Sequence, residues 1–308
     1  MNIWRITISP SAVAGVDPRK FCLDRKILGV GWRVDVPAPL DWETYWELGH
    51  AKYYYGYPGW WPAVNAVHNR MSIGDLCWTR DLEGNYYLGR IEGEWEYRSE
   101  PEYPEYLKAD VVNVRSCCWV PMGTVDSVPG KVQNSFCRGR AVQAINSDTV
   151  RFYSKLLFND GIGYEVYDLP DINDQRLDLF DLCSPEDCED IVAIHLQAKY
   201  GYYLIPSTCR PDTVKTEFVL RNDKGKAQIQ VKQGTPPLDR DQYRLEKSNP
   251  CQWFLFSTSR NYHGSNASHV HCLEPNNLRD FAFDNATLMP RRIQKLIEFC
   301  QRGRPTGE

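Results

Sequence analysis

The stretch from Glu217 to Lys232 constrains the fold of this chain more than any other segment. Apolar and polar residues alternate on both sides of a polar turn at Asn222 to Gly225, and this pattern predicts a β-hairpin. We expect folding about this turn to place Glu217 opposite Lys232. Side chains two residues apart share one face of a strand, so Gln230 is expected on the same face.

This hairpin would bring an acid, an amide oxygen and a lysine together on one patch of sheet. A hard cation such as Mg²⁺ takes a few oxygen ligands from a protein and keeps its other positions for water and phosphate. A nearby lysine orients or deprotonates the attacking water and offsets charge on the phosphate. The triplet therefore predicts metal-dependent phosphodiester cleavage. The alternative is an ordinary hairpin whose polar residues face solvent.

A helix is predicted immediately upstream of this hairpin. Ser184 is a good N-cap, Pro185 suits the first helical position, and acids follow in the first turn. The helix is expected to continue to about Lys199, with Glu189 in its first turns and within reach of the same patch. Residues 200–206 then read as a strand.

Further core elements are predicted after the hairpin. Residues 251–259 and 270–273 read as two strands, and residues 288–299 read as a helix with Pro290 near its start. The predicted order is therefore a helix bearing an acid, a strand, a hairpin strand bearing an acid, a strand carrying Gln-X-Lys, two more strands and a closing helix.

This order resembles the nuclease core of the PD-(D/E)XK superfamily, and most closely its Mrr-like restriction endonuclease branch, where Gln replaces the second acid. The resemblance covers residues 184–300. It implies an α/β core, a mixed sheet flanked by helices, with Mg²⁺ or Mn²⁺ as cofactor. It also implies Glu217, Gln230 and Glu189 as metal ligands together with the Val231 carbonyl. Lys232 would then position or activate water.

One residue competes with Glu217 for the acidic position of this motif. Asp212 follows Pro211 and gives a literal Pro-Asp pair. Glu217 is preferred because the hairpin places it across from Lys232, whereas Asp212 would pair near Pro237, outside the strand.

The first half of the chain differs in composition from the second. Nine of the ten tryptophans lie at or before Trp119. Short strands are predicted at residues 3–8, 27–32, 75–79, 86–91 and 94–97, and a helix at 41–52. These elements predict an aromatic-rich, mainly β domain. It loosely resembles the PUA-like group that contains EVE and YTH domains, and an SH3-like barrel is the alternative.

The segment Tyr53 to Trp61 is rich in aromatic residues and is interrupted by Gly and Pro. We expect it to form a loop that exposes some of its rings, with Tyr55, Tyr57, Trp60 and Trp61 as candidates for stacking on a flipped or modified base. Core packing and a protein-interaction patch are the competing interpretations.

Charge and composition bear on the domain boundaries and on the partners. The predicted domains are a recognition domain at 1–158, an acidic linker at 159–183 and a nuclease domain at 184–308. The last of these is the only net-positive part, and Arg291 and Arg292 are among its candidate phosphate contacts. The formal net charge of −4 argues against indiscriminate coating of nucleic acid.

The eleven cysteines are an odd number without a Cys-X-X-Cys pair, which predicts reduced thiols in the cytoplasm. No apolar run is long enough to cross a membrane.

The sequence thus predicts a Mg²⁺-dependent DNA endonuclease for modification-dependent restriction or phage defence, whose N-terminal domain recognises the nucleic acid. Cutting both strands would need two sites, and therefore favours a homodimer. Two alternatives stay open. One is a nucleic-acid-binding regulator without catalysis, and the other is a protein-interaction module of a larger defence system.

Overall fold

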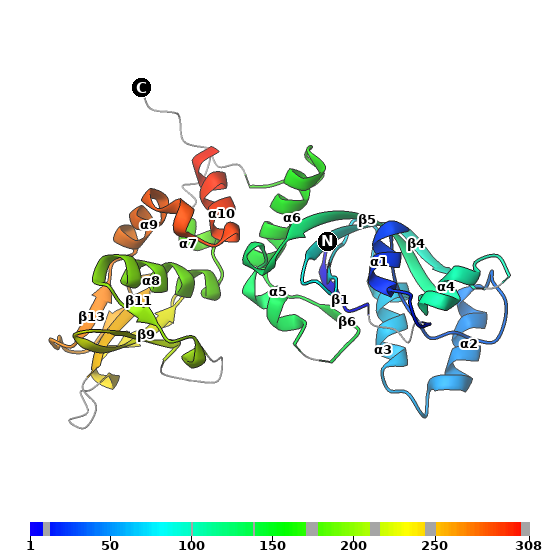
Figure 1. Ribbon diagram of the computed structural model, residues 1–308, viewed down its shortest axis with the longest axis horizontal. Coiled ribbons are helices and arrows are strands. Elements are labelled where there is room, and N and C mark those ends of the chain that lie inside the picture. The colour runs from blue at the N-terminus through cyan, green and yellow to red at the C-terminus, as the bar shows by residue number, and fades with distance from the viewer. Residues whose placement is uncertain are drawn as a thin grey trace. The chain divides into compact units, whose positions relative to one another are not determined.

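The computed structural model describes residues 1–8, 13–99, 101–137, 139–170, 178–209, 216–243 and 251–302. The chain divides into two compact units, residues 1–169 and 170–308 (Figure 1). Both contain helices and mixed sheets, so the expected α/β character of the second half is confirmed at that coarse level. Each unit is described by itself.

The first unit is built on a six-stranded sheet with the order β2-β5-β4-β3-β1-β6. Neighbouring strands are antiparallel except for β1 and β3, which are parallel. The strands are β1 (Ile3–Ile6), β2 (Ile27–Val30), β3 (Leu76–Arg80), β4 (Tyr86–Tyr97), β5 (Asn113–Gly123) and β6 (Val142–Ala144).

The two strands predicted at residues 86–91 and 94–97 are one long strand, β4. Its pairing with β5 shifts register between Ile91 and Trp95, so the polar residues between them form an irregularity and not a break. Strand β5 was not predicted, because its polar and cysteine residues obscure the alternation of apolar side chains.

Helices and short turns connect these strands. They are α1 (Pro18–Asp24), α2 (Trp42–Tyr53), α3 (Trp60–Asn65), η1 (Ala66–Arg70), α4 (Pro104–Ala109), η2 (Val125–Ser127), α5 (Gly130–Ser135) and α6 (Asp148–Ile162). The predicted helix at 41–52 is confirmed as α2, and the Asp41 carboxylate caps it by accepting the Thr44 N–H at 2.8 Å.

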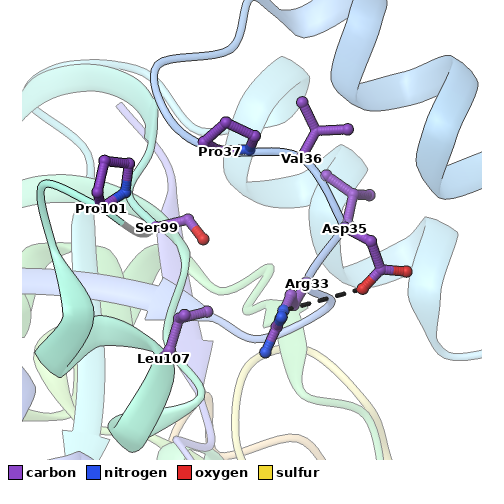
Figure 2. A pocket seen from close by; sticks show the side chains of 8 residues that line it. Arg33, Asp35, Val36, Pro37, Ser99, Pro101 and Leu107 are labelled. Atoms are coloured by element: carbon purple, nitrogen blue, oxygen red, sulfur yellow. Dashed lines mark ion pairs between the residues drawn. The ribbon is translucent and has the colours of Figure 1, made fainter.

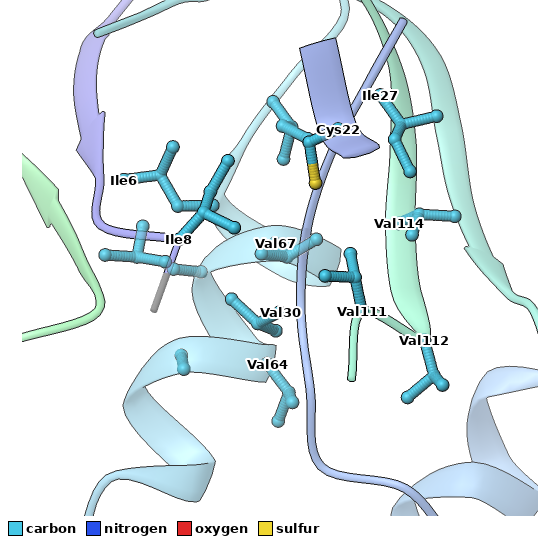
Figure 3. Packing of buried hydrophobic residues seen from close by; sticks show 14 of the residues in the cluster. Ile6, Ile8, Cys22, Ile27, Val30, Val64, Val67, Val111, Val112 and Val114 are labelled. Atoms are coloured by element: carbon cyan, nitrogen blue, oxygen red, sulfur yellow. The ribbon is translucent and has the colours of Figure 1, made fainter. Parts of the chain in front are cut away.

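The core of the first unit lies between its sheet and helices α3 and η1. Figure 3 shows Ile6, Ile27 and Val114 from three strands facing Val64 and Val67 from these helices. All five side chains are buried. Burial of aliphatic side chains is the main favourable term in folding, so this cluster is a major source of stability for the unit.

The predicted acidic linker begins within the first unit. Residues up to Ile162 belong to helix α6, and the Asn159 amide bonds the backbone of Val166 and Tyr167. The Tyr167 hydroxyl donates to the Gly74 carbonyl at 2.8 Å. This part of the segment therefore packs on the first unit and is not an exposed connector. Residues 171–177 lie outside the described residues.

The second unit contains a five-stranded sheet with the order β13-β11-β9-β8-β7. Strand β8 is antiparallel to its neighbours β7 and β9, whereas β9, β11 and β13 are parallel. The strands are β7 (Tyr203–Leu204), β8 (Phe218–Asn222), β9 (Gly225–Lys232), β11 (Cys251–Ser257) and β13 (Val270–Leu273). A separate parallel pair joins β10 (Leu238–Asp239) to β12 (Tyr262–His263).

The helices of the second unit are α7 (Leu179–Leu182), α8 (Pro185–Tyr200), α9 (Pro275–Asp284) and α10 (Arg291–Arg302), with short turns η3 (Pro206–Thr208), η4 (Arg240–Gln242) and η5 (Ala286–Leu288). The predicted start of α8 is confirmed. The Ser184 hydroxyl accepts the Asp187 N–H, and the Asp187 carboxylate accepts the Ser184 N–H in return. Helix α8 contacts β9, and Glu189 on this helix lies close enough to Glu217 and Lys232 for their charges to affect its pKa.

Candidate active site

The β8–β9 hairpin forms where it was predicted, but its register differs by two residues. Asn222 pairs with Gly225, so the turn contains two residues and not four. The ladder ends where Phe218 pairs with Ile229, and the Glu217 N–H donates to the carbonyl of the same Ile229 at 2.9 Å. The prediction that Glu217 lies opposite Lys232 was therefore wrong. A shift of two residues keeps every side chain on its face, so the three polar groups still share one side of the sheet.

The three polar side chains of this hairpin converge on one carboxylate oxygen. The Gln230 Nε2 group donates to Glu217 Oε1 at 2.5 Å, and Lys232 Nζ lies 3.8 Å from the same oxygen. Gln230 is only 1 % exposed, whereas Lys232 is partly open to solvent. The site thus runs from a buried amide to a lysine that a substrate can reach.

Helix α8 contributes a second carboxylate to this patch. Burial raises the pKa of Glu189 to about 8, and the negative charges of Glu217, Glu186 and Asp190 add to the rise while Lys232 opposes it. Burial also raises the pKa of Glu217, against the effect of Lys232 and of hydrogen bonds from the Val231 backbone and Gln230. Two partly buried carboxylates in each other's field favour a bound proton or cation.

The amide oxygen of Gln230 is the least satisfied atom of the patch. Because Nε2 faces Glu217, Oε1 points elsewhere, and it is buried without a hydrogen-bond partner. A buried carbonyl oxygen left unpaired costs about 1–3 kcal/mol. A cation bound at this position would remove that cost.

The Val231 carbonyl is also directed toward this patch. The N–H and C=O of one strand residue point to the same side, and the Val231 N–H bonds the Glu217 carboxylate. Glu217, Glu189, Gln230 and Val231 together offer oxygen ligands only, which suit Mg²⁺ or Mn²⁺ better than softer metals. In the part of the chain that the structure describes, no cluster of three or more His, Cys, Asp or Glu residues could hold a metal ion. The set proposed here contains two such residues.

Two further residues bear on the surroundings of Glu217. Asp212 lies outside the described residues, so its position relative to Glu217 stays open. Tyr243 was not predicted at all, yet it is buried close enough to Glu217 for that charge to contribute to its pKa, which burial raises to about 12. It lies within the connection between the parallel strands β9 and β11, and no local pattern in the sequence indicates its location.

Arg292 is not a phosphate contact. It is buried, and its guanidinium group donates to Asp187 and Asp190 on helix α8. The prediction that Arg292 contacts phosphate was wrong, because its two acidic partners lie more than a hundred residues earlier in the chain and no local pattern indicates this pairing. Arg291 is exposed, at 4.0 Å from Glu298, and remains available for an anionic ligand.

The aromatic segment of the first unit is only partly exposed. Trp60 is the first residue of helix α3 and is only 1 % exposed. Its ring packs directly against Gly49, so closely that a Cβ atom on Gly49 would lie 2.7 Å from the ring. Its prediction as a base-stacking residue was therefore wrong. Trp61, Tyr55 and Tyr57 are exposed, by 39 %, 93 % and 55 %.

A pocket of about 280 Å³ lies elsewhere in the first unit. It is formed by residues 33–37 together with Ser99, Pro101 and Leu107 (Figure 2). Arg33 and Asp35 form an ion pair beside it, with Nε and Oδ1 4.0 Å apart. The described residues that line this pocket include none of the predicted base-stacking residues.

Comparison with known proteins finds no matching family model, no matching curated protein and no matching solved structure. None of the helices among the described residues is long and apolar enough to cross a membrane.

Proposed function

We propose that the second unit is a Mg²⁺- or Mn²⁺-dependent DNA endonuclease with a PD-(D/E)XK core of the Mrr-like type. The observation that carries this proposal is the convergence of the Gln230 amide and Lys232 on Glu217, next to Glu189; both carboxylates have raised pKa values, and the Gln230 amide oxygen is buried without a hydrogen-bond partner. A site that only stabilised the fold would gain from a hydrogen-bond donor at this position. A site that awaits a cation would not.

The residues of the patch divide into two roles. Glu217, Glu189, the Gln230 amide oxygen and the Val231 carbonyl would hold the cation. When bound, the cation would polarise the scissile phosphate and lower the pKa of a water. Lys232 holds a positive charge at the solvent side of the patch, where it would orient the attacking water and offset charge on the phosphate.

The order of elements supports this assignment. Helix α8, strands β7, β8, β9, β11 and β13, and helix α10 occur in the expected order, with one further helix, α9, between β13 and α10. Glu189 lies on α8, Glu217 immediately precedes β8, and Gln230 and Lys232 lie on β9, which is consistent with the proposed core.

The first unit would recognise the nucleic acid, with Trp61, Tyr55 and Tyr57 as the exposed rings. Tyr57 contacts Trp32 and Tyr53 edge-on, at centroid distances of 6.1 and 5.6 Å, so its orientation is held by its neighbours. A ring held in this way loses little entropy when a base stacks on it.

All eleven cysteines lie in described residues and are thiols, which fits a reducing cytoplasmic compartment. A homodimer would supply one active site for each DNA strand. A modified base is one candidate feature for recognition, in keeping with modification-dependent restriction or phage defence.

The deciding experiment compares two lysines of one strand. Purified protein is stripped with EDTA and incubated with modified and unmodified plasmids, with and without Mg²⁺ or Mn²⁺. Lys232→Ala is expected to reduce cleavage by about 10²-fold or more. Lys226→Ala, six residues earlier on the same face of β9, should leave cleavage unchanged.

A second readout does not depend on activity. Calorimetric titration with Mn²⁺ should give binding to wild type that Glu217→Ala abolishes. Metal-dependent cutting that persists in Lys232→Ala would contradict the role of this lysine. Nucleic-acid binding without cutting at any metal concentration would favour the regulator, and absence of both would favour the protein-interaction module.

A further inference from the structure

A second cavity lies in the same unit as the candidate active site, on the other face of its sheet. Its volume is about 520 Å³, within the range of small-molecule sites. It opens beside the β8–β9 turn, where strand β9 begins, whereas Lys232 ends that strand. Its floor residue Phe254 pairs with Ile229, whose side chain lies on the opposite face of β9 from Gln230 and Lys232, so this cavity is separate from the metal patch.

The floor of this cavity is aromatic. Phe254 is buried at its base, with the ring centroids of Tyr200 and Tyr202 at 5.8 and 5.9 Å from its own. The His271 ring stacks on Phe254 at 5.0 Å with an interplanar angle of 28°. Flat rings around one space favour a flat ligand, and every nucleobase offers such a face.

The polar groups of the cavity suit the edge of a heteroaromatic ring. His271 Nε2 and the Gln252 side-chain oxygen are 2.7 Å apart, so the imidazole donates from Nε2 and its Nδ1 is an acceptor. Burial lowers the pKa of His271, which favours this neutral form. The Gln252 amide nitrogen remains as a donor, so the two side chains together present a donor and an acceptor.

A positive charge stands at the rim. Lys224 lines the cavity from the exposed β8–β9 turn. The Asn222 side chain fixes its surroundings, because Oδ1 accepts the Lys224 N–H at 2.9 Å and Nδ2 donates to the Tyr200 carbonyl at 3.3 Å. Among the described residues that line the cavity there is no acid. The rim therefore favours an anionic group next to the flat ring.

We propose that this cavity binds one nucleotide unit, with the base against the Tyr200, Phe254 and His271 rings and the phosphate at Lys224. The unit has two chemical sources, a free mononucleotide or an unpaired nucleotide of a strand. The proposal does not depend on the nuclease function, because none of these residues belongs to the metal patch.

Calorimetric titration of the full chain in EDTA tests the proposal without any contribution from metal. The probes are AMP, GMP, CMP and UMP, the matching nucleosides, and a ten-residue oligothymidylate. Tyr200→Ala is expected to weaken binding about tenfold or more, since stacking contributes about 1–3 kcal/mol per base. Tyr203→Ala is the matched control, because Tyr203 is exposed nearby in sequence but does not line the cavity.

A second variant separates the phosphate from the base. Lys224→Gln should weaken the binding of nucleotides and leave the binding of nucleosides unchanged. Circular dichroism checks whether Tyr200→Ala and Lys224→Gln fold. If Tyr200→Ala fails to fold, the comparison of nucleotide with nucleoside in Lys224→Gln decides.

Each arm has a defined meaning. Mononucleotide binding that depends on Tyr200 identifies a free ligand, and binding of the oligonucleotide alone identifies a strand, and both support the proposal. Absence of binding at millimolar concentration overturns it. Binding that is the same in wild type, Tyr200→Ala and Lys224→Gln overturns it as well, whether or not the protein cleaves DNA.

Discussion

Replacing Glu189 by Gln is expected to stabilise the metal-free second unit while impairing its activity. The folded-state pKa of Glu189 is raised to about 8, whereas an unperturbed glutamate titrates near pH 4.3. The folded state therefore binds the proton more tightly than the unfolded chain does. As the pH rises from the unfolded value toward about 8, the folded state progressively loses this advantage.

The magnitude follows from the size of this shift. One pKa unit corresponds to about 1.4 kcal/mol, so at pH 7 the cost of placing Glu189 in this site is about 3 kcal/mol. Glu189→Gln keeps the shape of the side chain and carries no charge. The variant should exceed wild type by about 3 kcal/mol at pH 7 and by less than about 1 kcal/mol at pH 5.

Hydrogen exchange of peptides from β9 and β11 is the suitable assay, because it reports opening of the second unit separately from the first. After correction for intrinsic exchange, Glu189→Gln should slow exchange about 10²-fold at pH 7 in EDTA. Saturating Mg²⁺ should reduce this difference, since the cation stabilises wild type preferentially. Asp284→Asn, at an exposed site on α9, should change exchange less than about threefold. Equal pH dependence in wild type and Glu189→Gln would refute the assigned electrostatics.

Three more outcomes are expected. Arg292→Ala should destabilise the second unit by about 3–5 kcal/mol, because it leaves Asp187 and Asp190 without their counter-charge. Arg291→Ala should change stability by less than about 0.5 kcal/mol. Urea unfolding measures both variants, and equal effects would contradict the buried pairing. Trp60→Ala should destabilise the first unit by about 3–5 kcal/mol, because its ring is buried. Trp61→Ala should stay folded and should weaken nucleic-acid binding by about 1–3 kcal/mol per stacked base in a titration. A folded Trp61→Ala variant that binds like wild type would exclude this ring as a stacking residue. Metal-dependent cleavage should rise with pH up to about 8, because the cation has to displace the proton of Glu189 and that proton is held less often as the pH rises. A flat pH–rate profile would show that this carboxylate does not bind the metal.

The face of the hairpin was predictable from the sequence, but its register was not. Alternation with period two places Glu217, Gln230 and Lys232 on one side for any even shift. The shift itself depends on how many residues the turn contains. Asn222 and Gly225 look like turn residues, yet they form the last pair of the ladder, so the turn is Asp223 and Lys224.

Long-range packing explains the predictions that were wrong. Arg291 and Arg292 are identical neighbours in sequence, and only the acids of a distant helix distinguish the buried one from the exposed one. Trp60 lies in a segment rich in Gly, Pro and Tyr, which indicates a loop. The space that receives its ring is created by Gly49 on the preceding helix, and no local pattern records that contact.

The pairing of Arg292 with helix α8 also sets an order for assembly during synthesis. Asp187 and Arg292 are 105 residues apart in the chain. At about 5–20 residues per second, the ribosome makes the helix that carries Glu189 about 5–20 s before it makes the arginine that neutralises the acids beside it. Over that interval Asp187 and Asp190 have no counter-charge from α10, and their burial is unfavourable. If the proposed function holds, a nascent chain would complete the proposed metal patch only after α10 has been made, and cutting would wait until the unit is whole.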